Sequence, residues 1–290
     1  MSEMFDMRPV SIVQITDLHI KQPGALTYGK VDTAAFLRRA VISLNAIVPR
    51  PDAVVITGDL VDQGQERQYQ YLKSILADLH IPYYLLVGNH DAREALRHVF
   101  AESAYLREGP QSADGECFVQ YGVDIGPLRF LALDSLVVGK PGGTLCAARL
   151  QWLATALSDT HDRPVVIGLH HPPFASGIGH MDGTVLDENA TAGLAAIVSR
   201  YPNVERVIAG HIHREIHTRF AGTIASTAGS TAHQVCLDLR PDAPDNFTME
   251  PPSFVIHRWT PTNGLISHLG YIGDYAGPFP FRDGGGVLLD

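Results

Sequence analysis

Five short apolar segments of this chain each end in residues of the types that bind metal ions. The segments are rich in β-branched residues and are bounded by turn-forming residues, which is the pattern of buried strands. The residues at their ends are, in chain order, Asp17-Leu18-His19, Gly58-Asp59, Gly88-Asn89-His90-Asp91, His170-His171 and Gly210-His211-Ile212-His213. One such strand end could arise by chance, but five in one chain narrow the folds that it can adopt.

The apolar segments alternate with helical patterns, and this alternation predicts an α/β domain. Strands are expected at 10–16, 53–57, 83–87, 128–133, 165–169 and 204–209. Asp32 can cap a helix whose apolar stripe runs from Phe36 to Ile47, and a second stripe runs from Tyr69 to Leu79. Because the carboxyl ends of strands in an open α/β sheet line one crevice, the five strand ends should converge there.

The composition changes near residue 240. We expect residues 1–240 to form the α/β domain and residues 241–290, which are rich in proline and glycine, to form a small cap or dimerisation segment. Regular structure should be sparse in that segment, with one strand at 254–259. The aromatic residues Tyr275, Phe279 and Phe281 favour packing on the domain or on a second subunit, and a disordered tail is the alternative.

Composition and charge exclude several classes of function. The chain has 290 residues, of which 45% are hydrophobic, and its 22 basic and 31 acidic residues give a formal charge of -9. This acidic balance argues against a nucleic-acid polymer or an anionic membrane as the partner. No apolar stretch approaches the roughly 18 residues of a membrane span. A globular protein that acts on a small molecule fits these totals best.

The cysteines and the N-terminus predict a cytoplasmic location. Cys117, Cys146 and Cys236 are odd in number and have no CxxC spacing, so they do not form a disulfide framework and fit a reducing compartment. The N-terminal residues include Glu3 and Asp6 and precede a short apolar run. A signal peptide would have a basic region and a longer apolar region instead.

The strand ends supply enough ligands for two metal ions. The candidates are Asp17, His19, Asp59, Asn89, His170, His211 and His213. If Asp59 bridges, these seven residues make two sets of four ligands. All donors are oxygen or imidazole nitrogen and none is a thiolate, which favours Fe, Mn, Zn or Co. Two such ions about 3.5–4 Å apart form a site suited to displacement at phosphorus.

Local spacing supports this convergence. In an extended segment alternate residues share a face, so Asp17 and His19 could reach one centre, and so could His211 and His213. Adjacent residues point apart, and we therefore expect only one residue of each adjacent pair, such as His170 and His171, to bind metal. The glycines at 58, 88 and 210 allow the backbone to approach the site closely.

The blocks DLH, GDLVD, GNHD, HHPP and GHIH, in this order over residues 17–213, resemble the motifs of the calcineurin-like metallophosphoesterases. Within that family the chain is most similar to bacterial class III cyclic-nucleotide phosphodiesterases and to glycerophosphodiesterases, through RPDAVVITGDLVD, YYLLVGNHD, LHHPP, STAHQV and DYAGPF. The resemblance implies a four-layer α/β/β/α sandwich and a phosphodiesterase that uses two divalent metal ions. It also implies a homodimer or a higher homo-oligomer.

The resemblance further implies a role for each site residue. One metal would be bound by Asp17, His19, Asp59 and His213, and the other by Asp59, Asn89, His170 and His211. His90 would be catalytic, facing the substrate to stabilise the phosphoryl charge or to protonate the leaving oxygen. Asp91 would orient His90 or cap the following helix. Asn89, His90 and His233 would bind the substrate.

Other candidate residues lie outside these motifs. Tyr28 and His180 lie in glycine-containing loops and are candidates for the substrate pocket. We assign structural or surface roles to His98, His161, His171, His217, His257 and His268. The substrate expected first is a 3′,5′-cyclic nucleotide such as cAMP, with a glycerophosphodiester as the alternative. A nuclease would need a basic surface for its polymer, and this chain has no basic excess. A non-catalytic metal-binding scaffold should have lost ligands or His90, and all of these residues are present.

Overall fold

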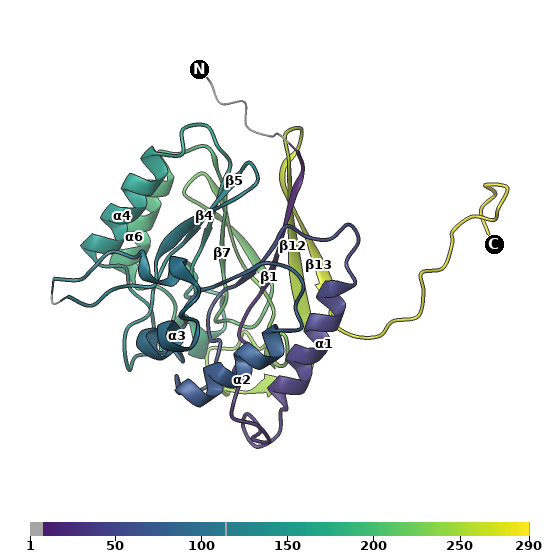
Figure 1. Ribbon diagram of the computed structural model, residues 1–290, viewed down its shortest axis with the longest axis horizontal. Coiled ribbons are helices and arrows are strands. Elements are labelled where there is room, and N and C mark those ends of the chain that lie inside the picture. The colour runs from purple at the N-terminus through teal and green to yellow at the C-terminus, as the bar shows by residue number, and fades with distance from the viewer. Residues whose placement is uncertain (1–7, 114, 290) are drawn as a thin grey trace.

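Two β-sheets pack face to face and helices cover both outer faces, as expected for the four-layer sandwich (Figure 1). The computed structural model describes residues 8–113 and 115–289, so the expectations for Glu3 and Asp6 concern residues outside this range. Within the described residues no helix combines the length and the apolar character needed to cross a membrane.

The first sheet carries three of the five strand ends. Its strand order is β13-β12-β1-β2-β3. Strands β1 (Val10–Ile15), β2 (Ala53–Ile56) and β3 (Tyr83–Leu85) are parallel. Their carboxyl ends therefore lie at one edge of the sheet, where the loops 16–19, 57–62 and 86–91 begin.

The second sheet carries the other two strand ends. Its order is β4-β5-β6-β7-β9-β8, from β4 (Tyr121–Ile125), β5 (Leu128–Ala132), β6 (Val165–Gly168), β7 (Val204–Ala209), β8 (Ile216–Phe220) and β9 (Thr223–Thr227). Strands β5, β6 and β7 are parallel, so the loops that follow β6 and β7 also lie at one edge. The expected strands are present, whereas β4, β8 and β9 were not expected from the sequence.

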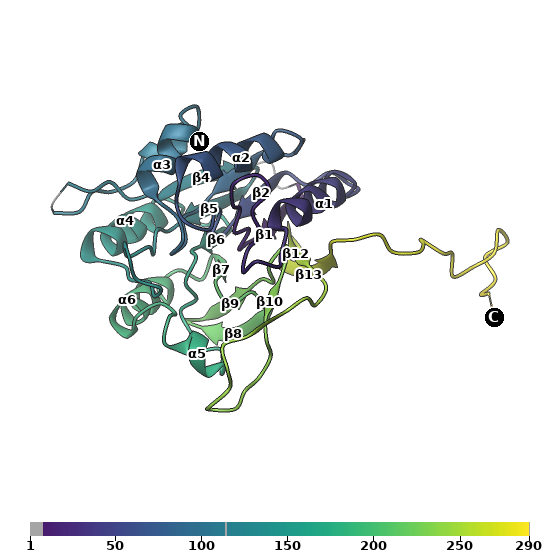
Figure 2. The same ribbon diagram turned by 90° about the horizontal axis from the view of Figure 1, so that it is seen from below.

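Helices α1 (Thr33–Asn45) and α2 (Glu66–Leu76) lie against the first sheet, and α3 (Arg93–Val99) lies beside α2 (Figure 2). Helices α4 (Ala147–Ser158) and α6 (Glu188–Val198) lie against the second sheet. Asp32 caps α1 as predicted, because its Oδ1 accepts a hydrogen bond from the Ala35 amide at 3.0 Å. The predicted stripe from Tyr69 to Leu79 is buried, although α2 itself ends at Leu76. Two short helical segments, η1 (Ala104–Arg107) and α5 (Gly179–Asp182), lie in loops.

The core has two parts that hold the sheets and helices together. The larger part joins α1 and α2 to the first sheet and reaches Phe130 and Ile208 of the second sheet. The smaller part joins α4 and α6 to the second sheet. Both sheets are thereby fixed to each other, and so are the loops at their carboxyl ends.

The region after residue 240 contains more regular structure than expected. Strand β11 (Phe247–Thr248) pairs with β10 (Gln234–Val235), and β12 (Ser253–Thr260) pairs with β1 and with β13 (Gly264–Tyr271). Beyond β13 the chain runs away from the body, and Phe279 and Phe281 are exposed there (Figures 1 and 2). A domain boundary at residue 240 stays a prediction.

Candidate active site

The candidate ligands lie in strained turns and not in extended segments. Five of them have left-handed backbone conformations, with φ of 54° at Asp17, 45° at His19, 48° at Asp59, 72° at His211 and 53° at His213. The expectation that alternate residues converge because the chain is extended was therefore wrong. Each left-handed residue costs roughly 1–2 kcal/mol. Backbone hydrogen bonds between loops hold the strain, among them Asp17 N to Gly58 O at 3.1 Å and His19 N to Asp59 O at 2.9 Å.

Glycines make room for the ligands, as expected. Gly58 has φ of 94°, and a Cβ atom at this position would collide with the imidazole of His170. A Cβ atom on Gly88 would collide with the carboxylate of Asp59. Both positions require glycine because a side chain would occupy the space of a candidate ligand.

Asp17, His19 and His213 form one buried group, in which one ligand atom of each lies within 4.8 Å of the others. His213 donates its Nδ1 proton to the His233 carbonyl at 3.0 Å, so its Nε2 carries a lone pair. That Nε2 lies 3.1 Å from His19 Nε2 and 3.5 Å from Asp17 Oδ1. The buried His19 Nδ1 has no hydrogen-bond partner among the described residues. A cation between the two Nε2 atoms and Asp17 Oδ1 would be bound by all three, with the ring proton of His19 on Nδ1.

His170 is at the centre of a second group, with Asp17 and Asp59. Its Nδ1–H donates to the Thr57 carbonyl at 2.8 Å, which directs Nε2 at Asn89 Oδ1, 3.1 Å away, and at Asp59 Oδ2, 3.4 Å away. A carbonyl that accepts a hydrogen bond from the other ring nitrogen fixes the orientation of a metal-binding histidine. The donors therefore fit a second divalent cation next to the first.

The electrostatics of the site also call for positive charge. Burial lowers the pKa of His211 to about 3 and that of His213 to about 4, so both rings are neutral and have a lone pair to offer. Burial acts in the same direction on His170, but the Asp59 carboxylate outweighs it and raises the pKa of His170 to about 9. Without a metal, a proton on His170 offsets the charge of the carboxylates.

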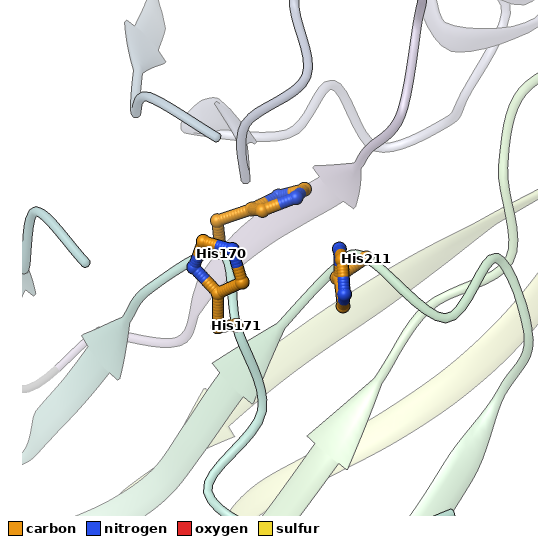
Figure 3. Close-up of side chains that lie close together, drawn as sticks. All are labelled: His170, His171 and His211. Atoms are coloured by element: carbon orange, nitrogen blue, oxygen red, sulfur yellow. The ribbon is translucent and has the colours of Figure 1, made fainter. Parts of the chain in front are cut away.

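His170, His171 and His211 lie close together (Figure 3). Both ring nitrogens of His171 are already engaged, with Nδ1 at 2.8 Å from Ser135 Oγ and Nε2 at 3.1 Å from the Pro141 carbonyl. Since Nε2–H donates to that carbonyl and Nδ1 accepts from the hydroxyl, His171 has no lone pair free for a metal. This geometry agrees with the structural role expected for His171.

His90 lines the cavity beside these groups. Its amide donates to Asp59 Oδ1 at 2.9 Å, and its Nδ1 donates to the Asp62 carbonyl at 2.8 Å, which leaves Nε2 as the free ring nitrogen. Burial lowers the pKa of His90, but the carboxylate of Asp59 and the carbonyl of Asp62 outweigh it, and the net pKa is raised. A ring that gains a proton readily suits a general acid.

Asp91 lies behind the site and does not hydrogen-bond to His90. Its carboxylate accepts from the amides of Leu60 and Gly88, at 3.1 and 2.8 Å, and from the Tyr69 hydroxyl at 2.9 Å. The helix-cap interpretation was wrong, because Ala92 is the N-cap of α3 and no side chain caps that end. The carboxylate instead ties together the loops that carry Asp59 and Asn89.

A cavity of about 750 Å³ opens over the cluster. The predicted pocket residues Tyr28, His180 and His233 line it together with His90. Tyr28 and Phe247 stack with ring centroids 5.1 Å apart, and each ring meets the His233 ring edge-on. His180 Nε2 lies 3.4 Å from the carboxylate of Asp245 at the rim.

Several residues of the cavity wall were missed by sequence reasoning, among them Phe247 and Thr184. Phe247 comes from β11, in the proline-rich region where no aromatic periodicity marks it. Thr184 follows α5 and lies 2.9 Å from Nε2 of His211. Neither residue belongs to a motif, so only the folded chain brings them to the site.

A two-sheet sandwich with an Asp/His cluster at the strand ends defines a class of metal-dependent hydrolases. The model of the calcineurin-like phosphoesterase family matches residues 10–215, and the chain belongs to this family. Its relatives are named phosphodiesterases. The chain is accordingly a metal-dependent phosphodiester hydrolase.

Several relatives are similar over most of their length. "Probable glycerophosphodiester phosphodiesterase GpdQ" of Arcobacter nitrofigilis is 38% identical over 96% of this chain and 99% of its own. A probable cyclic nucleotide phosphodiesterase of Rhodopseudomonas palustris is 35% identical over 84% of this chain and 86% of its own. A solved dimetal phosphatase from Danio rerio has a TM-score of 0.60 at 16% identity, covering 91% of this chain and 99% of that chain, which shows the fold alone.

Proposed function

We propose that the chain hydrolyses small phosphodiesters at two divalent metal ions held by the strand-end residues. The first ion would be bound by Asp17, His19, Asp59 and His213, and the second by Asp59, Asn89, His170 and His211. The observation that carries this proposal is the orientation of His170 and His213, whose Nδ1–H groups donate to backbone carbonyls so that both Nε2 atoms point at carboxylate oxygens. Fe, Mn, Zn and Co all suit these donors.

Two divalent ions in such a site generate a strong nucleophile from water near neutral pH and neutralise phosphoryl oxygens. The chain's own residues would do the rest. His90 donates Nδ1–H to the Asp62 carbonyl, which leaves Nε2 to carry a proton to the leaving oxygen or to stabilise the phosphoryl charge. Asp91 would not touch the substrate and would act indirectly, by holding the loops that carry Asp59 and Asn89.

The far wall of the cavity would bind the alcohol groups of the diester. Tyr28, Phe247 and His233 form an aromatic surface there, with the two phenyl rings stacked at 27°. Burial lowers the pKa of His233 to about 3, so the ring is neutral and can donate or accept a hydrogen bond. The cavity volume of about 750 Å³ suits a small ligand.

We place glycerophosphodiesters first among the substrates and cyclic nucleotides second. The sequence alone favoured the opposite order. Two relatives named GpdQ match 96% and 94% of this chain and nearly all of their own length, including the region after residue 240 that supplies Phe247. The stacked Tyr28 and Phe247 rings favour the second candidate, because an aromatic surface can receive a nucleobase.

We further propose a cytoplasmic homo-oligomer. The three cysteines Cys117, Cys146 and Cys236 are free thiols, which suits a reducing compartment. The exposed rings of Phe279 and Phe281 support packing of the C-terminal segment on a second copy.

The test is a panel of turnover measurements on metal-stripped protein that is reloaded separately with Mn, Fe, Zn or Co. Glycerophosphoethanolamine, cAMP and bis(p-nitrophenyl) phosphate are the substrates, and the highest kcat/KM is expected for glycerophosphoethanolamine. A higher value for cAMP would reverse the order of the two candidates. Protein that binds two ions and hydrolyses none of the three would be a metal-binding scaffold.

A further inference from the structure

His211 is oriented differently from His170 and His213, two of the other candidate histidine ligands. His170 and His213 each donate a ring proton to a backbone carbonyl, of Thr57 and His233 respectively. His211 instead meets a side chain, since its Nε2 lies 2.9 Å from the hydroxyl oxygen of Thr184. This difference determines which nitrogen of His211 can face a metal.

The hydrogen bonds of Thr184 fix the tautomer of His211. The Thr184 hydroxyl donates its proton to the Met181 carbonyl at 2.8 Å, so its oxygen is left to accept from His211 Nε2–H. A neutral imidazole with a proton on Nε2 keeps its lone pair on Nδ1. His211 would then bind metal through Nδ1, whereas His170 and His213 would bind through Nε2.

Thr184 belongs to a loop that also forms the wall of the substrate cavity. The carboxylate of Asp182 ties the loop together by accepting from the amide and hydroxyl of Ser176 at 2.6 and 2.7 Å and from the Gly177 amide at 3.0 Å. His180, Met181 and Thr184 from this loop all line the cavity. The loop that would meet the substrate therefore also supplies Thr184, which hydrogen-bonds to the candidate ligand His211.

We propose that Thr184 is a positioning residue that holds His211 with Nδ1 toward the metal and thereby couples the cavity loop 176–184 to that metal site. The inference rests on the proposed function, because it takes His211 as a ligand. A valine at position 184 would keep the shape of threonine but leave His211 Nε2–H without its acceptor. Loss of a group that hydrogen-bonds to a metal-binding histidine typically lowers metal affinity by about 10–100-fold.

The test uses Thr184→Val, the conservative rescue Thr184→Ser, and the matched control Thr191→Val. The control removes a hydroxyl that donates to a backbone carbonyl, that of Leu186 at 3.2 Å, away from the cavity. Metal-stripped proteins are titrated with Mn²⁺ by calorimetry, and thermal unfolding of the metal-free forms checks their folding. Nitrogen NMR of the zinc-loaded wild-type protein reports which ring nitrogen of His211 carries the proton.

Thr184→Val should weaken one of the two sites by about tenfold or more and leave the other unchanged, and excess Mn²⁺ should restore most of kcat. Thr184→Ser and Thr191→Val should bind as the wild type does. Equal affinities for Thr184→Val and Thr191→Val, or a proton on Nδ1 of His211, would overturn the inference. A wild-type protein that fails to bind two ions would instead overturn the proposed function, and the inference with it.

Discussion

Replacing Tyr69 by phenylalanine should destabilise the protein by removing one hydroxyl group behind the site. Tyr69 lies on α2 and is fully buried. Its hydroxyl donates to Asp91 at 2.9 Å and accepts from the Ala92 amide at 2.8 Å. Asp91 in turn accepts from the amides of Gly88 and Leu60, which adjoin Asn89 and Asp59. The hydroxyl therefore holds a carboxylate that organises two ligand loops.

The magnitude follows from the two bonds lost. Burial raises the pKa of Asp91 to about 7, so above that pH the bond lost is one to a charged group. Such a bond contributes about 1.5–3 kcal/mol, and a buried amide left without a partner costs about 1–3 kcal/mol. These contributions overlap, so the free energy of unfolding should fall by about 2–4 kcal/mol. For a chain of this size each kcal/mol lowers Tm by roughly 2–4 °C, which gives a total of about 5–15 °C.

Urea unfolding of the metal-free protein measures this loss, with Tyr71→Phe as the control. Tyr71 lies on the same helix, but its hydroxyl only accepts from Arg38 at 3.4 Å in an exposed position. The control should change the free energy of unfolding by less than about 0.5 kcal/mol. If both variants lose the same stability, the Asp91 network does not hold the loops as described.

Three further predictions concern single residues. His90→Ala should lower kcat by about 10²–10⁴-fold with both metals retained, and a loss of metal would make His90 a ligand. Asn89→Ala should weaken one metal site by more than the roughly 10–100-fold that loss of a group hydrogen-bonded to a ligand costs and should cut turnover, and unchanged metal content and activity would remove it from the ligand set. Burial lowers the pKa of His257 to about 3 from the usual 6.5, so the unfolded chain takes up the proton first and stability is lost as pH falls through 6.5 toward 3. Between pH 7.5 and 5 the free energy of unfolding of His257→Gln should therefore fall by about 2 kcal/mol less than that of the wild type. Urea unfolding of the metal-free proteins measures both changes, and equal losses would contradict this reasoning.

The strands near the site could be anticipated from the sequence because buried parallel strands are continuous apolar runs. The runs at 10–16, 53–57, 165–169 and 204–209 became β1, β2, β6 and β7. Within each sheet the carboxyl ends meet because parallel strands share a direction. The two sets of strand ends come together because the two sheets pack against each other, and neither step needed knowledge of loop conformation.

The local conformations could not be anticipated, because tertiary contacts impose them. Asp17 and His19 keep their left-handed conformations because their amides donate hydrogen bonds to the carbonyls of Gly58 and Asp59. Strand β13 was missed because Gly264, Ser267 and Gly270 interrupt its apolar pattern. Hydrogen-bonded pairing with β12 stabilises this strand although these three residues have low strand propensity. Phe247 and Thr184 reach the site across long loops that no periodic pattern predicts.

The central claim is that the strand-end cluster binds two metal ions and that both are needed for hydrolysis. The most direct measurement is the rate of bis(p-nitrophenyl) phosphate hydrolysis by metal-stripped protein as Mn²⁺ is added, with bound metal counted in parallel. We expect activity to rise with occupancy and to reach its plateau when two ions are bound per chain. Full activity in the metal-stripped protein, or with one ion bound per chain, would contradict the account.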